Sequence, residues 1–381
     1  MRILFTADLH LNIATRNPRT RLNARESLSE IVERENPSCV VVAGDIGACK
    51  QAHLHLVTIR KAVGERLLAI TLGNHDFWMD SRGHAQFSCL DQMVTRFWRE
   101  PARDVGAVLL DRENADLGDF LLVGGYGHFD LGLAEPNLQV RGRRITEDIY
   151  LSGGMNGLFW NDFRSIPNCA TRVRAEAEEQ AEGFAARMDE AIASGKRLLV
   201  ATHTCPWREL NGHPRSGTET DILSAYSGNS LIGGEIERRS ASVDFLMCGH
   251  THMPVRERKL HGITCLNVGA DYGIFRGVIY ETDSKKITWV GEPIASCDGD
   301  TDDSVISLPH WWERLEIIQE PRPHIPEKEI LAAMPAALHP RWDQFMLGQG
   351  VLALDDGAAG INPCDFARFK EWLQSSARNG S

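Results

Sequence analysis

The sequence predicts an α/β fold in which a β-sheet is covered by helices on both faces. Two observations support this fold class. Short apolar runs, too continuous for strands with one solvated face, alternate with segments whose apolar residues recur at helical spacing. In addition, clusters of polar residues follow several of these runs, which is where open α/β sheets place their ligands.

The predicted elements of the first half alternate regularly. A helical pattern that follows the first strand ends at Asn36-Pro37, because proline cannot continue a helix. A second helical pattern covers residues 51–63. The predicted strands are residues 3–7, 39–43, 67–72, 108–110 and 120–123.

The second half begins with residues 129–168, which show weak periodicity and many loop formers, and we expect an insertion over the strand ends. A long amphipathic helix is predicted over 170–192. Further strands are expected at 198–202 and 245–248, followed by closing strands of a second sheet at 263–268, 278–280 and 287–290. An acidic linker at 297–303 separates a domain of residues 1–295 from a C-terminal extension, 304–381, with no assigned role.

The composition is that of a soluble globular protein, with 43% hydrophobic and 24% charged residues and no apolar run long enough to cross a membrane. The nine cysteines are scattered without CxxC spacing, which favours a reducing, cytoplasmic location over a disulfide framework or a thiolate zinc site. The formal net charge of −11 disfavours nucleic acid as a partner but does not exclude a locally basic groove.

Five polar clusters carry the candidate chemistry. They are Asp8-x-His10, Gly44-Asp45, Gly73-Asn74-His75-Asp76, Thr202-His203 and Gly249-His250-Thr251-His252. Carboxylate, imidazole and amide donors without thiolate suit Mn, Fe, Zn, Co or Ni. Seven candidate ligands are too many for one tetrahedral zinc ion and suit two adjacent ions, which can stabilise the attacking and leaving oxygens of a displacement at phosphorus.

In this order the five clusters resemble the DxH, GD, GNHD, H and GHxH blocks of the calcineurin-like metallophosphoesterase superfamily, over about residues 1–290. The resemblance implies a four-layer α/β/β/α sandwich with two mixed β-sheets and a dinuclear centre at the sheet edges. The C-terminal extension lies outside it. Two divalent ions are implied, with manganese as the first choice and Fe, Zn, Ni or Co as alternatives.

The resemblance also implies roles for individual residues. His75 is similar to the catalytic histidine that protonates or stabilises the leaving oxygen, with Asp76 orienting its ring, and a metal-bridging hydroxide is the implied nucleophile. The implied ligands are Asp8, His10 and His252 for the first metal, Asn74, His203 and His250 for the second, and Asp45 as the bridging carboxylate.

Three further residues are candidates for substrate contacts. His128 follows a strand in a glycine-rich loop, and Asn161 lies in the expected insertion. Arg16 belongs to an arginine-rich segment that either draws an anionic substrate toward the metals or forms a solvated helix face with Glu26 and Glu30. For His128 the alternative is a structural role in the core.

The expected function is metal-dependent hydrolysis of a phosphomonoester or phosphodiester, with nucleotides among the candidate substrates. One alternative is a DNA or RNA nuclease of the same superfamily, which cleavage of oligonucleotides would reveal. A second alternative, from another class, is a non-catalytic scaffold on the same fold, which would bind metal without hydrolysing any phosphoester.

Overall fold

The computed structural model describes residues 1–293, except 14–15, 18–19, 141–142, 156–157 and 213–218, together with three short strands further on. The chain divides into two compact units, Met1–Gly154 with Trp160–Ala295, and Met155–Phe159 with Ser296–Ser381. The three short strands form an antiparallel sheet in the second unit: β17 (Ile325–Pro326), β19 (Ala359–Ile361) and β18 (Leu352–Ala353). Most of the predicted C-terminal extension, 304–381, lies outside the described residues.

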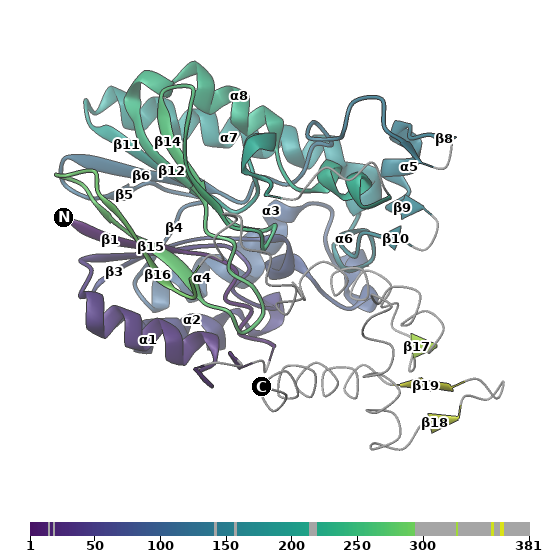
Figure 1. Ribbon diagram of the computed structural model, residues 1–381, viewed down its shortest axis with the longest axis horizontal. Coiled ribbons are helices and arrows are strands. Elements are labelled where there is room, and N and C mark those ends of the chain that lie inside the picture. The colour runs from purple at the N-terminus through teal and green to yellow at the C-terminus, as the bar shows by residue number, and fades with distance from the viewer. Residues whose placement is uncertain are drawn as a thin grey trace, which may run out of the picture. The chain divides into compact units, whose positions relative to one another are not determined.

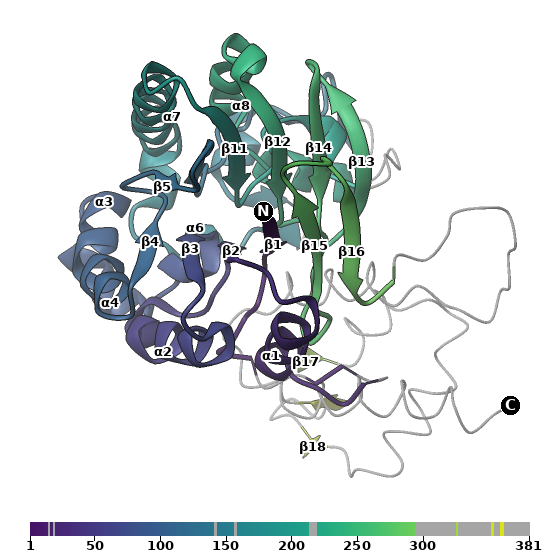
Figure 2. The same ribbon diagram turned by 90° about the vertical axis from the view of Figure 1, so that its left-hand side faces the viewer.

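The first unit contains two six-stranded mixed sheets (Figures 1 and 2). In the first sheet, in the order β16-β15-β1-β2-β3-β4, strands β1 to β4 are parallel to one another. Strand β15 is antiparallel to both of its neighbours, β1 and β16. The strands are β1 (Arg2–Thr6), β2 (Cys39–Ala43), β3 (Leu67–Thr71), β4 (Ala107–Leu109), β15 (Arg276–Glu281) and β16 (Ile287–Gly291). The assignment of 278–280 and 287–290 to the second sheet was wrong, because β15 pairs antiparallel with β1.

The second sheet has the order β13-β14-β12-β11-β6-β5, with parallel central strands and an antiparallel strand at each edge. Its strands are β5 (Ala115–Asp116), β6 (Phe120–Gly125), β11 (Arg197–Thr202), β12 (Val243–Cys248), β13 (Val255–Leu260) and β14 (Ile263–Asn267). The sequence pattern missed β13, since its four central residues are charged and exposed, as is common at a sheet edge.

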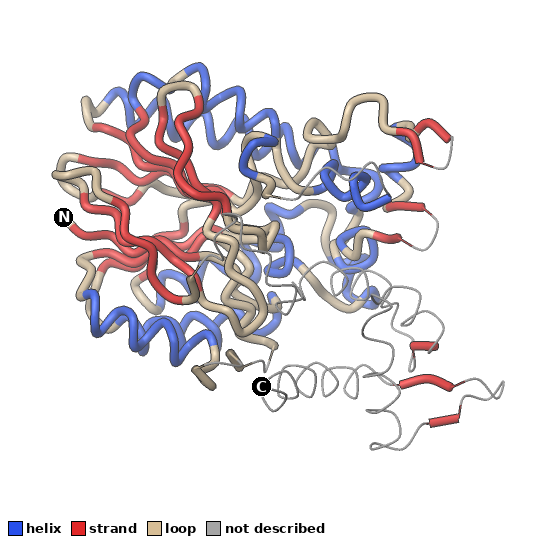
Figure 3. Tube along the Cα trace, viewed as in Figure 1, coloured by secondary structure: helices blue, strands red, loops and turns tan. Residues whose placement is uncertain are grey.

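The four longest of the described helices lie on the two outer faces of the stacked sheets (Figures 2 and 3). Helices α1 (Ala24–Glu35) and α2 (Ala52–Val63) cover the first sheet, and α7 (Cys169–Ala193) and α8 (Ser230–Arg238) cover the second. None of the helices in the described part of the chain has the length and apolarity that a membrane span requires. The shorter elements are α3 (Leu90–Met93), α4 (Arg99–Asp104), β7 (Gln139–Val140), β8 (Arg143–Arg144), α5 (Glu147–Leu151), β9 (Gly154–Met155), β10 (Leu158–Phe159) and α6 (Asp162–Ser165).

The core between the two sheets explains why the strands are apolar throughout. Phe5 and Val41 of the first sheet share one buried cluster with Leu199 and Phe245 of the second. Alternate residues face outward, and Val200 packs in a separate cluster with residues of α7 and α8. With apolar contacts on both faces of each sheet, the molecule is the predicted four-layer α/β/β/α sandwich, and that prediction is confirmed.

Candidate dinuclear metal centre

The candidate ligands lie where strands of both sheets end. Asp8, Asp45 and Asn74 follow the neighbouring parallel strands β1, β2 and β3, so their side chains meet at one edge of the first sheet. His203 follows β11 and His250 follows β12, which are parallel neighbours in the second sheet. Backbone hydrogen bonds join the loops, including Asp8 N–H to Gly44 O at 3.0 Å. The fold therefore brings five distant segments together.

Most of these residues share an unusual backbone conformation. A positive φ is uncommon outside glycine because Cβ crowds the backbone, and it clusters at functional sites. Five of the seven candidate ligands have it: Asp8 (55°), His10 (42°), Asp45 (50°), His250 (72°) and His252 (55°). The chain thus accepts local strain after β1, β2 and β12, where these side chains are directed into the site.

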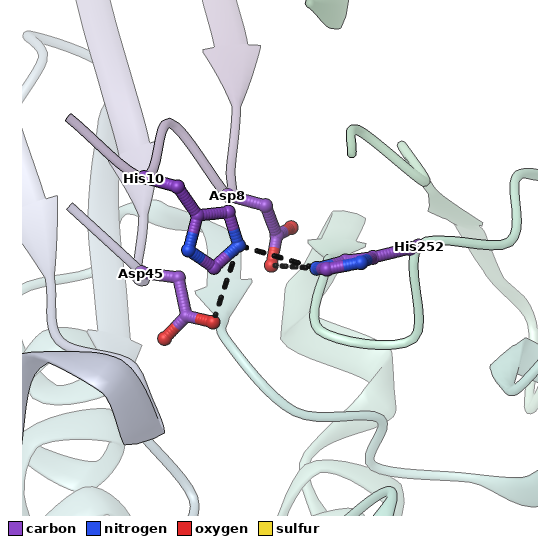
Figure 4. Close-up of side chains that lie close together, drawn as sticks. All are labelled: Asp8, His10, Asp45 and His252. Atoms are coloured by element: carbon purple, nitrogen blue, oxygen red, sulfur yellow. Dashed lines mark hydrogen bonds and ion pairs between the residues drawn. The ribbon is translucent and has the colours of Figure 1, made fainter. Parts of the chain in front are cut away.

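Asp8, His10, Asp45 and His252 form the first cluster, in which four potential ligand atoms lie within 4.8 Å of one another (Figure 4). His10 Nε2 is 3.2 Å from His252 Nε2 and 3.7 Å from Asp45 Oδ2. His252 Nε2 is 3.6 Å from Asp8 Oδ1. The four donors converge on one point with mixed oxygen and nitrogen chemistry.

Asp45, Asn74, His203 and His250 form the second cluster. His203 Nε2 lies 3.3 Å from Asp45 Oδ1 and 3.1 Å from Asn74 Oδ1. His250 Nδ1 lies 3.1 Å from Asn74 Oδ1 and 3.2 Å from His203 Nε2. Asp45 therefore belongs to both clusters and directs a different carboxylate oxygen at each, as a bridging carboxylate can.

In three of the four clustered histidines, the ring nitrogen that points away from the cluster has a polar partner. A backbone carbonyl can only accept, so His203 Nδ1 donates to Ala43 O at 2.9 Å and His250 Nε2 donates to Tyr226 O at 3.2 Å. His252 Nδ1 lies 3.1 Å from Asp271. In the rings of His203 and His250 the remaining nitrogen then directs its lone pair into the cluster, which is the arrangement of a metal ligand.

The pKa shifts of the buried carboxyl and imidazole groups are also consistent with bound cations. Burial raises the pKa of Asp45 well above its usual range, and the neighbouring carboxylates of Asp8 and Asp76 raise it further. Burial and nearby imidazoles lower the pKa of His10 and of His203. Divalent ions between these groups would offset both the carboxylate repulsion and the burial cost. The residues present therefore fit two divalent cations.

The glycines of the motifs leave room for these side chains. A Cβ added at Gly73 would collide with the carboxylate of Asp45, and one at Gly249 would collide with that of Asp8. Any larger residue at either position would displace a candidate ligand.

His75 lies at the rim of the clusters. Its backbone N–H donates to Asp45 Oδ1 at 2.9 Å, and its ring Nε2 is 3.9 Å from Asp45 Oδ2. The side chain is 12% exposed, in contrast to His10 at 1% and His203 at 0%, so His75 can meet a substrate that reaches the clusters. Its ring stacks on the indole of Trp78.

The geometry differs from the expected role of Asp76. Its carboxylate accepts from the backbone N–H groups of Gly47 at 2.8 Å and Gly73 at 2.7 Å, and no hydrogen bond to the His75 ring occurs among the described residues. Asp76 is fully buried, and burial raises its pKa to about 7. It joins the loops after β2 and β3, and the expectation that it orients the His75 ring directly is corrected.

The three candidate substrate contacts have different surroundings. His128 is fully buried, with Nδ1 3.2 Å from the hydroxyl of Tyr126, which supports the core alternative. Arg16 is exposed and forms an ion pair with Glu26 at 2.8 Å, which supports the solvated-face alternative. Asn161 is half-buried at the N-cap of α6.

The sequence analysis missed Asp271, and it did not predict that Asp162, which lies in the expected insertion beside Asn161, contacts a candidate ligand. Asp162 accepts a hydrogen bond from Asn74 Nδ2 at 3.0 Å, and Asp271 holds His252. Burial raises the pKa of Asp162 to about 6. Neither residue lies in one of the five motifs, and each reaches its partner only through the folded structure.

The two-sheet sandwich and the paired donor clusters define a candidate dinuclear metal hydrolase. A sequence model of the family described as Calcineurin-like phosphoesterase matches residues 1–254, and the chain belongs to this family. The prediction of a phosphoric ester hydrolase that acts with metal is thereby confirmed at the level of the family.

Solved structures with a similar fold include a hydrolase and a phosphatase. The phosphopantetheinyl hydrolase of Mycobacterium tuberculosis is 16% identical, with a TM-score of 0.53 over 71% of this chain and 89% of that one. A dimetal phosphatase from Danio rerio is also 16% identical, with a TM-score of 0.42 over 77% of this chain and 99% of that one. At this identity the likeness concerns the fold alone. The comparison with curated proteins gave no match.

Proposed function

We propose that this protein hydrolyses a phosphomonoester or phosphodiester at the two donor clusters. The observation that carries the proposal is Asp45, whose Oδ1 faces His203 at 3.3 Å while its Oδ2 faces His10 at 3.7 Å. A carboxylate shared in this way is suited to hold two cations side by side.

Each cluster would hold one divalent ion, with Asp45 common to both. The other ligands are Asp8, His10 and His252 in the first cluster, and Asn74, His203 and His250 in the second. When bound, such ions polarise a phosphoester and lower the pKa of water. The oxygen donors beside the imidazoles favour manganese among the candidate metals.

His75 would assist the leaving group. It is the most exposed of the histidines at the clusters, and its imidazole is held at the rim by Trp78. A neutral imidazole can donate one N–H, and a ring placed beside the clusters could donate it to the departing oxygen. Asp76 would act indirectly, by fixing the loop from which His75 projects.

The catalytic domain in this proposal is residues 1–295, with residues 129–168 as an insertion beside the site. Asp162 supports the placement of the insertion, because it contacts Asn74 directly. A cytoplasmic location is also proposed. Its support is that all seven cysteines in the described residues are free thiols, as in proteins of reducing compartments.

The test is a substrate panel with the full chain, stripped of metal with a chelator and reloaded with Mn²⁺, Ni²⁺, Co²⁺ or Zn²⁺. We expect metal-stimulated hydrolysis of aryl phosphate mono- or diesters, lost in Asp45→Ala and kept in His53→Ala, which alters an exposed histidine. Cleavage of single- or double-stranded oligonucleotides alone would assign a nuclease. Metal loading without any hydrolysis would contradict the proposal and indicate a scaffold.

A further inference from the structure

Asp162 is a buried carboxylate that lies outside the ligand clusters but contacts one of their members. Its Oδ1 accepts from Asn74 Nδ2 at 3.0 Å and from Trp78 Nε1 at 2.6 Å. Its Oδ2 accepts from Trp160 Nε1 at 2.9 Å. The side chain is fully buried, and all three partners are neutral donors, so nothing in this hydrogen-bond set requires a carboxylate for charge pairing.

The first of these hydrogen bonds decides which end of the Asn74 amide faces the cluster. An asparagine side chain has an acceptor oxygen on one side and two N–H donors on the other. Because Asp162 can only accept when ionised, it holds Nδ2 and leaves Oδ1 3.1 Å from both His203 Nε2 and His250 Nδ1. A flipped amide would direct N–H groups at a cation and could not bind it.

The second hydrogen bond reaches His75. Trp78 donates its indole N–H to Asp162 and stacks its ring on the imidazole of His75, with centroids 3.7 Å apart. A hydrogen bond to a carboxylate is stronger than one to a neutral acceptor, so Asp162 fixes the plane on which His75 rests. The Asp162 carboxylate is thus hydrogen-bonded both to a candidate metal ligand, Asn74, and to Trp78, on which His75 stacks.

We propose that Asp162 is a positioning residue that fixes the Asn74 amide as a ligand of the second metal and, through Trp78, the ring of His75. The inference rests on the proposed function. It adds a residue from the 129–168 segment to the proposed site. The His75 ring, which Asp76 was expected to orient, is instead oriented through Trp78 and Asp162.

A structural role alone is the competing explanation, and the chain offers a matched control. The carboxylate of Asp111 accepts hydrogen bonds in the same arrangement as that of Asp162, with two donors on one oxygen and one donor on the other. Its Oδ2 accepts from Thr71 and from Leu72 N–H, both at 2.9 Å, and its Oδ1 accepts from Tyr126 N–H at 2.9 Å. None of these donors belongs to a candidate ligand, so Asp111→Asn removes a buried carboxylate that has no hydrogen bond to the clusters among the described residues.

The experiment measures binding of Mn²⁺ to the metal-free full chain by isothermal titration calorimetry, with circular dichroism to check the fold. We expect two ions per wild-type chain. In Asp162→Asn the side chain keeps one acceptor oxygen for three donors and places N–H groups against at least one of them, so it no longer fixes Asn74. One of the two ions should then bind about 10- to 100-fold more weakly, as is typical when the support of a ligand is weakened. In Asp111→Asn both affinities should stay within about threefold of wild type.

A second variant keeps the inference testable if Asp162→Asn does not fold. Asn74→Asp offers the metal a carboxylate, which by itself should bind as tightly as an amide or more tightly. The new carboxylate, however, would lie against that of Asp162 and be repelled by it. We expect weaker binding of one ion, and unchanged or tighter binding would overturn the inference. Equal binding by wild type and Asp162→Asn would overturn it as well, whereas a wild-type chain that binds no ion would overturn the proposed function instead.

Discussion

The imidazole of His75 lies almost flat against the indole of Trp78, with ring centroids 3.7 Å apart and an angle of 20° between the planes. The imidazole edge also approaches the ring of His10, with centroids 4.6 Å apart. Stacking on Trp78 and the nearly perpendicular ring of His10 leave the His75 ring little freedom to rotate. Its orientation therefore comes from ring contacts.

This contact predicts a difference between two substitutions of Trp78. Trp78→Phe keeps a flat ring under His75, whereas Trp78→Leu removes it. We expect Trp78→Leu to lower kcat by about 100-fold, the effect of misplacing a catalytic group by about 1 Å. Trp78→Phe keeps the stacked ring and loses only the hydrogen bond to Asp162, so it should lower kcat by a smaller factor. Steady-state kinetics on an aryl phosphate measure both, and equal losses would argue against orientation by stacking.

His75 itself should affect turnover without affecting the metals. We expect His75→Ala to lower kcat by about 10²- to 10⁴-fold, the usual contribution of a general acid, while the metal content stays at the wild-type value. Elemental analysis of the same samples gives that content. His53→Ala, at an exposed position of α2, serves as the control and should leave both quantities unchanged. Loss of metal in His75→Ala would make His75 a ligand instead.

Asp271 should support the first cluster as Asp162 supports the second. Its carboxylate lies 3.1 Å from His252 Nδ1, and it raises the pKa of His252, which burial alone would lower. We expect Asp271→Asn to weaken one ion by about 10- to 100-fold in calorimetry. Asp283→Asn, at an exposed residue paired with the chain's N-terminus, should bind both ions normally. Normal binding by Asp271→Asn would show that His252 needs no carboxylate partner.

Burial of His128 predicts a pH-dependent stability. Burial lowers its pKa to about 3, with a smaller effect from His250, and the titratable group that faces it is the Tyr126 hydroxyl. Since the unfolded side chain titrates near pH 6.5, the folded state loses stability as the pH falls below that value. The loss from this residue is about 2 kcal/mol between pH 7 and pH 5. Urea unfolding at the two pH values should show a smaller decline in His128→Phe than in wild type, and an equal decline would contradict a buried neutral His128.

The sequence predicts the strands of the sandwich well because they are apolar on both faces. Strand β2 begins and ends at the predicted residues, and α7 extends one residue beyond the prediction at each end. Strand β13 could not be recognised, since an edge strand with a charged exposed face has no apolar run. The sheet to which β15 and β16 belong could not be recognised either, because strand pairing depends on contacts between residues far apart in the chain.

The same limit applies to the site. The seven candidate ligands could be found because each motif is short and follows a strand, so parallel neighbours bring them to one edge. The burial of His128 and the contacts of Asp162 and Asp76 depend on which segments pack against each other. For Asp76, two nearby backbone N–H groups compete with the His75 ring for the carboxylate, and they prevail.

The central claim is that one carboxylate serves two metal ions, and the metal content of Asp45→Ala tests it most directly. Purified wild-type and variant chains are loaded with Mn²⁺, passed through a desalting column and measured by elemental analysis. The account predicts two ions in wild type, one in His252→Ala and fewer than one in Asp45→Ala, because Asp45 faces both clusters. Retention of one full ion or more in Asp45→Ala would contradict a shared carboxylate.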